Sequence, residues 1–437
     1  MKRPSGLKGF VAITMGQTVS ITGTGMTQFG LSFWVWQQYG KATPFSIMNV
    51  LFFGAQVIFG LVAGSLIDRW SRKVSLILPD VASGVLTLMA LYLYSHGNLT
   101  LAFLYAMSLI NGMFSALQFP AYSVTLAAML KPEEYTRANA LFSLTDYGPA
   151  LIAPILAGGL LNIIGLQGIM AIDILTLMFA AAINMWVFIP PTVLKSNTPA
   201  KGLARLWEDI STGFRFIMER KELLTLLIVF LLNNFFAGFG SVLISPYILA
   251  RTNNNPVAAG TVESFMGIGG LLGAGIFSFY VVRGRKILPL LWGDILIDAG
   301  SAFLGMARSL IPMCGVAALS SFGGVMANTH SQAIWQSIVP IDLQGRVFSA
   351  RRFMAEVVSI IPTFLSGPIV DYYLVPYFTE KNIFTSTLGS GPAGAMAFVI
   401  VIGSLVSIAV SVWAMANPSV IHVEDLAQSV SSLPTRD

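Results

Sequence analysis

Twelve long apolar stretches recur along the 437-residue chain, and they limit what it can fold into. The hydrocarbon core of a bilayer is about 30 Å thick, so a helix needs roughly 20 apolar residues to cross it. Backbone polar groups find no water there, which leaves helices as the way for such stretches to span. We therefore predict an all-α polytopic membrane protein with twelve transmembrane helices. The predicted spans are 9–36, 44–67, 74–95, 101–129, 138–162, 167–190, 223–250, 257–282, 287–306, 310–339, 347–374 and 392–416.

The composition supports this class and argues against others. Only 10% of the residues are charged, against roughly 25% in soluble domains, and 55% are hydrophobic. The first span is too long and too polar for a cleaved signal peptide. The single cysteine, Cys314, excludes an internal disulfide or a multi-cysteine metal site. The chain has no phosphate-binding glycine loop, no paired Cys/His spacing and no nucleophile elbow, so we expect no enzyme activity, cofactor or metal.

Positive charges predict the topology. If both termini are cytoplasmic, counting along the twelve spans puts 21 of the 25 Lys and Arg residues on the cytoplasmic side. Only Lys41, Arg251, Arg308 and Lys381 fall on the other side. Basic cytoplasmic loops also explain the net charge of +5 without nucleic-acid binding.

The longest internal hydrophilic stretch, 191–222, divides the chain. Leu203, Leu206, Ile210, Phe214 and Ile217 recur in it at helical spacing, which predicts an amphipathic helix on the cytoplasmic membrane surface. We therefore expect an N-terminal six-helix bundle at 1–190, a linker at 191–222, a C-terminal six-helix bundle at 223–416 and a cytoplasmic tail at 417–437.

The two halves resemble each other. Lys131-Pro132 and Arg137 in the first half match Pro340 and Arg346 in the second, and at the same offset Pro154 matches Pro362. The bases Arg283, Arg285 and Lys286 repeat those of residues 69–73 but lack the acid. A duplicated six-helix unit, with a substrate path between pseudo-symmetric halves, is typical of transporters.

The segment 64–73 concentrates charge between two spans. A small residue, Gly64, allows close helix approach, and an acid followed by bases can form a latch against a neighbouring helix end. The residues predicted to form this latch are Gly64, Asp68, Arg69, Arg72 and Lys73.

The same five residues resemble the signature of the major facilitator superfamily in the loop between its helices 2 and 3, with Ser71 where glycine is usual. In the resembled fold, Asp68 would face the start of the helix near Arg346, which adds Arg346 to the predicted latch residues. The segments Gly16 to Ser20, Ala171 to Thr176 and Gly345 to Ser349 are similar to the macrolide-efflux branch of drug:proton antiporters. The Pro/Gly run from Pro149 to Gly159 resembles a motif of export-type members. This resemblance implies a monomeric exporter of a small amphipathic molecule in a bacterial cytoplasmic membrane, in contact with lipids and driven by protons. Related families imply an alternative, a siderophore exporter or a lysophospholipid flippase, in which an anionic head group would engage Arg351 or Arg352.

Acids inside spans are candidates for proton coupling, because ionisable residues are costly in the membrane and a carboxyl group in low dielectric binds its proton more tightly. Asp146 and Glu356 fall near the bilayer midplane at comparable positions of the two halves, with Asp173 as a third candidate. A neighbouring Arg351 or Arg352 could instead neutralise Glu356. Asp80, Asp294 and Asp298 lie on spans that flank the central path in the resembled fold, and we expect them to be structural.

Polar and aromatic residues of the first, fourth, seventh and tenth spans suggest a substrate pocket, since these helices line the cavity in the resembled fold. An alternative for each amide is a cross-link between helices. The predicted substrate-binding residues are Gln17, Gln28, Asn111, Gln118, Asn233, Asn234, Phe236, Asn328, His330 and Trp335.

Overall fold

The computed structural model describes residues 4–131, 134–190, 203–279, 284–381 and 383–426, and within them the regular elements are all helices. Ten helical segments there are long and apolar enough to cross a membrane. The elements are α1 (Gly6–Tyr39), α2 (Thr43–Arg69), α3 (Arg72–Ser95), α4 (Leu101–Met129), α5 (Tyr135–Trp186), α6 (Leu203–Met218), α7 (Lys221–Ser241), α8 (Ile244–Arg251), α9 (Pro256–Phe279), α10 (Ile287–Met306), α11 (Leu310–Ile338), α12 (Ile341–Pro368), a π-helical turn η2 (Ile369–Leu374), α13 (Val375–Thr379), α14 (Thr385–Leu388), α15 (Gly391–Ala416) and α16 (Pro418–Ile421).

The ten segments correspond to twelve crossings, because α5 contains two of them and α1 adds one more. Helix α5 has 52 residues and is interrupted at Gly165, whose φ of 66° is accessible to glycine and strained for other residues. It therefore consists of two arms, 135–164 and 166–186, that match the two predicted spans 138–162 and 167–190. Helix α1 has 34 residues, enough to span, although its polar side chains keep it out of the ten. The predicted twelve-helix, all-α fold is thus consistent with the structure.

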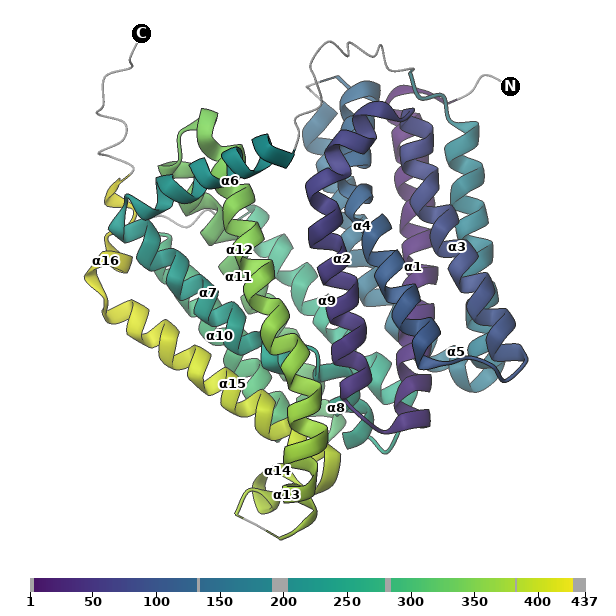
Figure 1. The fold of residues 1–437 in the computed structure, drawn as a ribbon, viewed down its shortest axis with the longest axis vertical. Coiled ribbons are helices and arrows are strands. Elements are labelled where there is room, and N and C mark those ends of the chain that lie inside the picture. Colours follow the sequence, from purple (N-terminus) through teal and green to yellow (C-terminus); the bar gives the residue numbers. More distant parts are fainter. Residues whose placement is uncertain (1–3, 132–133, 191–202, 280–283, 382, 427–437) are drawn as a thin grey trace. The chain divides into compact units, whose positions relative to one another are not determined.

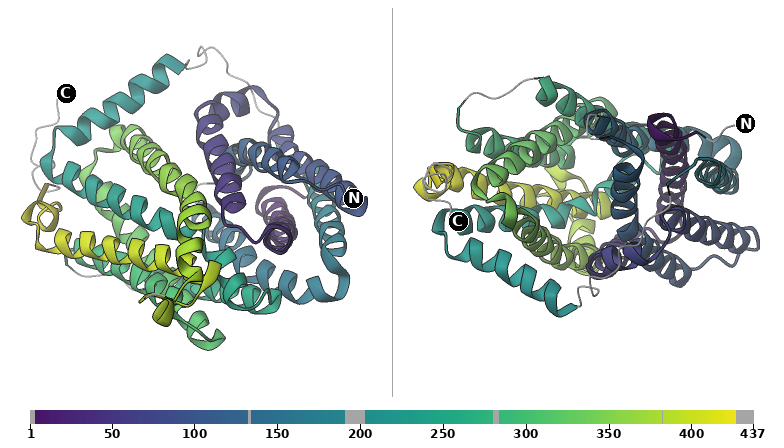
Figure 2. Two further views of the ribbon diagram at one scale, coloured as in Figure 1. Left: turned by 60° about the horizontal axis from the view of Figure 1, so that its bottom comes forward. Right: turned by 90° about the horizontal axis from the view of Figure 1, so that it is seen from above.

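The chain forms two compact units, which are described separately. Unit 1 comprises residues 1–203 and 248–264, and unit 2 comprises 204–247 and 265–437. In each unit the long helices run alongside one another as a bundle (Figures 1 and 2). Helix α9 begins in unit 1 and ends in unit 2.

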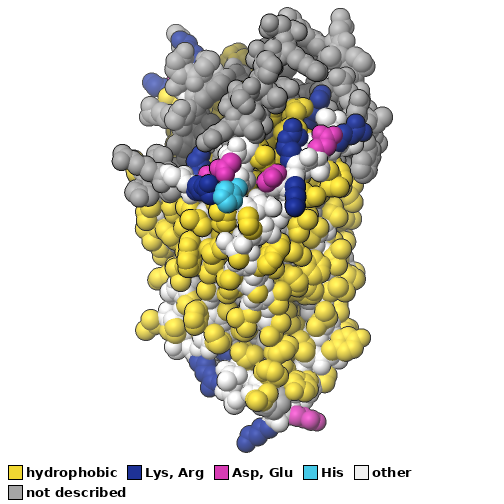
Figure 3. All heavy atoms as spheres, turned by 90° about the vertical axis from the view of Figure 1, so that its left-hand side faces the viewer, with side chains coloured by type: hydrophobic (Ala, Val, Ile, Leu, Met, Phe, Trp, Pro, Cys, Tyr) yellow, Lys and Arg dark blue, Asp and Glu magenta, His cyan; other side chains and the backbone are white. Residues whose placement is uncertain are grey.

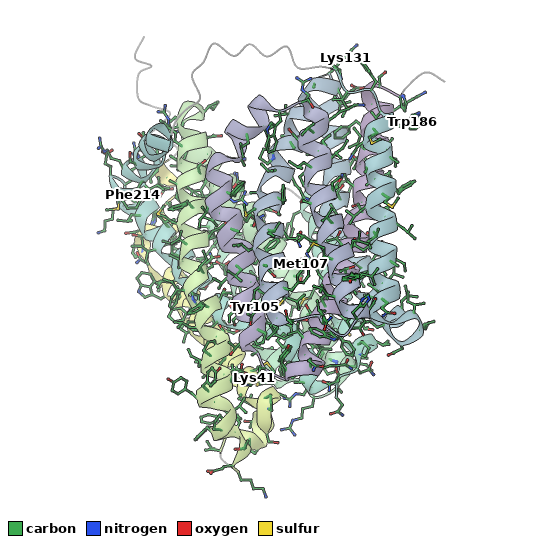
Figure 4. The ribbon with its side chains drawn as sticks, turned by 45° about the vertical axis from the view of Figure 1, so that its right-hand side comes forward. Lys41, Tyr105, Met107, Lys131, Trp186 and Phe214 are labelled. Carbon is green, nitrogen blue, oxygen red and sulfur yellow. The ribbon has the colours of Figure 1, made fainter. Side chains whose placement is uncertain are left out.

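In unit 1, α1 packs mainly against α5, and α2 packs against α4. Buried apolar side chains such as Phe10, Leu76 and Leu117 join α1, α3 and α4 into one core. Lys131 and Trp186 lie at one end of this unit and Lys41 at the opposite end (Figure 4). The alternation of ends along the chain is the one that successive membrane crossings require.

Helix α9 meets α5 in unit 1 at a crossing built from small residues. A Cβ added at Gly158 would lie 2.4 Å from the carbonyl oxygen of Pro256, and one added at Gly260 would lie 2.2 Å from that of Pro154. Near this crossing the Trp36 indole donates a hydrogen bond to Asn254 Oδ1 at 2.7 Å. The backbones of α5 and α9 are therefore in direct contact. A side chain at either glycine position would prevent this contact.

In unit 2, α10 packs against α11 and α15, and α7 packs against α12 and α15. The predicted linker helix is α6, and it belongs to this unit's core: Ile217 is fully buried with Leu223 and Val347. Phe214, which the periodicity assigned to the apolar face, is 42% exposed. The difference arises because Gly213 packs on the backbone of α12 at Arg346, which turns the neighbouring Phe216 and Ile217 inward.

The predicted span 223–250 is two helices, because the chain turns at Val242–Leu243 between α7 and α8. After the turn, the Tyr247 hydroxyl donates to the carbonyl oxygens of Leu304 and Gly305 at the end of α10, at 2.9 and 3.0 Å. One face of the molecule shows a broad band of hydrophobic side chains with charged groups beyond both ends of the band, most of them at one end (Figure 3). Such a band is expected of a surface that contacts lipid.

Candidate functional site: two polar cavities

Unit 1 contains a partly open cavity of about 260 Å³, and a carboxyl group lies in its wall. Asp80 of α3 is 4% exposed, and the side-chain amide of Gln17 on α1 donates a hydrogen bond to its Oδ2 at 2.7 Å. Burial without a partner would be costly for this carboxyl, so the amide sets its position. The cavity is lined by Gln17, Ile21, Gln56, Ser75, Leu76, Pro79, Asp80, Ser115, Gln118, Ala121, Tyr122 and Thr145.

Unit 2 contains a second partly open cavity, of about 340 Å³, and a carboxyl group in its wall is held in the same way. The side-chain amide of Asn233 on α7 donates to Asp294 Oδ2 of α10 at 3.2 Å. The cavity is lined by Leu226, Val229, Phe230, Asn233, Asn234, Ala237, Leu290, Asp294, Ile297, Asp298, Gly324, Ala327, Asn328, Ser331, Trp335 and Arg351.

The two carboxyl–amide pairs occupy equivalent helices of the internal repeat. Gln17 and Asn233 lie on the first long helix of each half, α1 and α7. Asp80 is the ninth residue of α3 and Asp294 the eighth of α10, the two helices that follow the matched basic loops. The internal repeat therefore includes the helices and also an acid hydrogen-bonded to an amide side chain in each half.

A second acid in unit 2 extends this network. Asp298, one helical turn after Asp294, is 3% exposed and accepts a hydrogen bond from the Ser407 hydroxyl at 2.5 Å. Asn233 also donates to Ser411 at 3.0 Å, so α7, α10 and α15 are joined through one amide. Partners on α7 and α15 therefore fix both carboxyl groups of α10 at the cavity wall.

The three acids predicted to couple protons lie in different surroundings. Asp173 is fully buried in unit 1, where the hydroxyls of Thr24 and Thr87 donate to it at 2.9 and 3.0 Å, and it lines neither cavity. Glu356 forms an ion pair with Arg352 at 2.7 Å, one of the two neutralising partners weighed from the sequence. Asp146 lies in the first arm of α5, and its side chain is outside the described part of the structure.

The predicted substrate residues divide into two groups. Six of them line a cavity, and Gln28, Asn111, Phe236 and His330 line neither of the two. His330 is 5% exposed, with its Nδ1 hydrogen-bonded to the Met326 carbonyl oxygen at 2.7 Å and its ring against Phe277. The six that line a cavity are Gln17, Gln118, Asn233, Asn234, Asn328 and Trp335.

The sequence assigned Asp80, Asp294 and Asp298 to structural roles. It suggested Arg351 as a neighbour of Glu356 and, together with Arg352, as a partner of an anionic head group in the alternative function. The three aspartates and Arg351 each line a cavity. The signal that could have found two of them is the repeat, because Asp80 and Asp294 follow matched basic loops at nearly the same distance.

Two bases of the 64–73 segment bind the end of α5 in unit 1. Arg72 Nη1 donates to the carbonyl oxygen of Pro190 at 2.8 Å, and Lys73 Nζ donates to that of Met185 at 3.0 Å. Cations commonly satisfy the free carbonyl groups at helix C-termini in this way. The other predicted latch residues, Gly64, Asp68 and Arg69, have side chains outside the described part, and Arg346 is exposed.

The contact made by Arg72 predicts a stability difference between neighbouring bases. We expect Arg72→Gln to lower the free energy of unfolding by about 1.5 kcal/mol or more, because it removes a charged hydrogen bond from a partly buried site. Lys73→Gln, the matched control at an exposed site, should change it by less than about 0.5 kcal/mol. Thermal unfolding in detergent measures both, and equal midpoints for the two variants would contradict the assignment.

The repeated basic loop in unit 2 finds its acids elsewhere in the chain. Arg285 pairs with Asp425 at 3.4 Å, and the Lys286 backbone amide donates to Glu424 at 2.6 Å. The acid that this loop lacks in sequence is thus supplied by residues following α16. Both contacts lie within unit 2.

A helical chain with many membrane crossings, an internal repeat and a polar cavity in each unit has the architecture that is typical of membrane transporters. Residues 13–363 match the model of the Major Facilitator Superfamily, and the chain belongs to that family. The resemblance seen in the 64–73 segment is thereby confirmed at the level of the family.

Among curated proteins, the chain is 24% identical over 378 residues to the uncharacterized MFS-type transporter YfiS of Bacillus subtilis (strain 168), covering 84% of this chain and 87% of that protein. It is 25% identical over 377 residues to macrolide efflux protein A of Streptococcus pyogenes, covering 83% and 89%.

Solved structures with the same fold include the nucleoside transporter NupG, with a TM-score of 0.69, 12% identity and coverage of 94% of this chain and 99% of that one. A bacterial homologue of the iron transporter ferroportin in an inward-facing state has a TM-score of 0.66, 13% identity and coverage of 93% and 98%. At these identities the likeness concerns the fold.

Proposed function

We propose that this transporter exports an amphipathic organic compound in exchange for protons, by alternating access of its two halves. The observation that carries the proposal is the duplicated carboxyl–amide pair, Gln17 with Asp80 and Asn233 with Asp294, each at the wall of a cavity that also has apolar surface. The similarity to macrolide efflux protein A supports export and an amphipathic substrate.

The coupling follows from the chemistry of a carboxyl group in a small cavity. Such a group can bind a proton when it faces one side of the membrane and release it when water or a substrate changes its surroundings. Asp80 and Asp294 fit this role because each has one amide partner and borders open volume. Asp146 remains a proposed coupling residue, and its neighbour Thr145 lines the unit 1 cavity.

The other two predicted coupling residues fit less well. Asp173 is enclosed between hydroxyl groups of α1 and α3, which favours a cross-link between helices. Glu356 already has a cationic partner in Arg352. Protonating either acid would break an existing contact without exposing it to a cavity, so we assign both a structural role in this proposal.

The proposed orientation places both termini in the cytoplasm of a bacterial cell, with the protein in the cytoplasmic membrane. The distribution of 21 of 25 basic residues on one side supports it. Lys131 and Lys41, which the topology assigns to opposite sides, lie at opposite ends of unit 1 (Figure 4). We propose that the working unit is a monomer, since each cavity lies within one compact unit of a single chain.

A second candidate function is transport of a molecule with an anionic head group, as in a siderophore exporter or a lysophospholipid flippase. The observation that favours it is Arg351, a cationic side chain in the wall of the unit 2 cavity.

The export proposal is tested by accumulation of labelled compounds in a bacterial host that lacks its own efflux pumps. Cells that produce the chain should accumulate less of a macrolide, or of another amphipathic compound in a panel, than cells with an empty vector. Dissipating the proton gradient should remove the difference. Equal accumulation across the whole panel, with the protein present in the membrane, would reject the proposal.

The latch at residue 68 gives a separate prediction. Asp68→Asn should reduce transport severalfold with normal membrane insertion, because we propose that this carboxylate holds the positive end of a helix when the cytoplasmic side closes. Initial transport rates per inserted molecule measure the effect, with Asp425→Asn as a control acid at an exposed site. A wild-type rate for the Asp68 variant would contradict the latch.

A further inference from the structure

Arg351 on α12 is a half-buried cation that lies against two aromatic rings in unit 2. Its guanidinium carbon lies 5.1 Å from the ring centroid of Phe230 and 5.2 Å from that of Trp335. Both distances are within the range of cation–π attraction. These rings contact the guanidinium but offer its N–H groups no oxygen atom as an acceptor.

Arg351 makes no hydrogen bond or ion pair with any residue that the structure describes, and its Nη1 is closed off from solvent. A guanidinium keeps its charge and presents five N–H donors in a rigid plane. A guanidinium nitrogen that is shielded from water without a partner is costly, so the retention of Arg351 at the wall of a cavity calls for an acceptor that arrives from outside.

The adjacent residue shows what an ordinary arginine of this helix does. Arg352 has a side chain that is 71% exposed and pairs with Glu356. One step along an α-helix rotates a side chain by about 100°, and this step separates an exposed guanidinium with an acidic partner from a half-buried one whose Nη1 has none.

The volume next to Arg351 can hold an organic ligand. The cavity of about 340 Å³ has Arg351, Phe230 and Trp335 in one part of its lining and the apolar Leu226 and Val229 beside them. Its acids, Asp294 and Asp298, already accept hydrogen bonds from Asn233 and Ser407 on other helices. The guanidinium is therefore the strong donor of this cavity that has no partner within the described residues.

We propose that the unit 2 cavity recognises an anionic oxygen group, a carboxylate or a phosphate, through Arg351, with the apolar body of the same molecule against Phe230 and Trp335. A planar guanidinium matches the two oxygens of such a group, and the aromatic walls hold its plane in place. The inference rests on the proposed function in one respect, that the bound molecule is the transported one. It names the substrate class: amphipathic molecules that carry an anion.

Binding by the purified full-length chain in neutral detergent tests the inference, by calorimetry with three probes. These are 2-naphthoate, its neutral isostere 2-naphthamide, and decyl phosphate as a lipid-like anion. We expect the wild type to bind at least one anionic probe about tenfold or more tightly than 2-naphthamide, because charged pairs at desolvated sites contribute more than neutral hydrogen bonds. The anion that binds shows whether the source is a soluble carboxylate or a lipid phosphate.

Two variants make the test specific to one side chain. Arg351→Gln should remove the preference for the anion, whereas Arg352→Gln, the matched control one residue away, should keep it. Equal affinity of the wild type for anionic and neutral probes would overturn the inference, and so would an equal loss in both variants. If Arg351→Gln does not fold, the wild-type comparison of 2-naphthoate, decyl phosphate and 2-naphthamide decides alone.

These outcomes are separable from failure of the proposed function. A chain that binds an anion through Arg351 but moves no compound across a membrane would contradict the proposed export function and support the anion site at Arg351. A chain that exports amphipathic compounds but binds neutral and anionic probes equally would contradict the anion site at Arg351 and support the proposed export function.

Discussion

Gly158→Ala and Gly260→Ala are each expected to lower the free energy of unfolding by about 2–3 kcal/mol, the cost of overpacking a close contact. An added Cβ would meet a backbone carbonyl oxygen of the facing helix at 2.4 Å from Gly158 and 2.2 Å from Gly260. Backbone atoms cannot move aside as a side chain can, so α5 and α9 would have to separate. Because the two substitutions strain one crossing from opposite sides, we also expect each to reduce transport strongly.

Matched controls exist on both helices. Gly159 on α5 and Gly275 on α9 have open space where a Cβ would be added. Alanine there should be neutral or slightly stabilising, since it favours the helix by about 0.5–1 kcal/mol over glycine. Thermal unfolding in detergent and transport rates should therefore separate the two pairs. Equal stability and transport for Gly158→Ala and Gly159→Ala would show that the α5–α9 crossing has no such importance.

Loss of the cavity carboxyl groups should uncouple transport from protons. Asp80→Asn and Asp294→Asn keep the shape of each side chain and a carbonyl oxygen that can still accept from Gln17 or Asn233. The variants should therefore fold, but neither replaced group can carry a proton. We expect each to lower proton-driven transport by about tenfold or more, because a neutral amide cannot replace an ionisable group in a membrane relay.

Exchange of labelled for unlabelled substrate separates coupling from binding. It needs no net proton movement, so it should persist in both variants while proton-driven transport falls. Asp425→Asn serves as a control, because that acid lies at the surface in an ion pair with Arg285. Full proton-driven transport by the Asp80→Asn/Asp294→Asn double variant would rule out both residues as carriers.

The helices could be predicted from hydrophobicity because lipid imposes one length and one secondary structure on every crossing. The interruption of α5 at Gly165 is also consistent with the sequence. The gap between the predicted spans 138–162 and 167–190 contains this glycine, and it adopts a positive φ. The turn between α7 and α8 could not be predicted in this way. It depends on the long-range hydrogen bonds of Tyr247 to the end of α10.

The site was harder to predict because it depends on helix rotation. Distance along the helix placed Glu356 near the bilayer midplane, but depth does not decide which neighbour a side chain meets, and Arg352 meets it. Arg351 and Arg352 are indistinguishable in sequence, and only packing on Phe230 and Trp335 separates them. Asp80 and Asp294 were assigned to structural roles from their helices alone, whereas their side chains line cavities.

The central claim, proton-coupled export, is tested most directly in inverted vesicles that contain the chain and a transported compound identified in the cellular panel. An imposed gradient with an acidic interior should drive uptake of the compound, and collapse of that gradient with a proton-exchanging ionophore should abolish it. Uptake that stays the same after the gradient has collapsed would contradict the account.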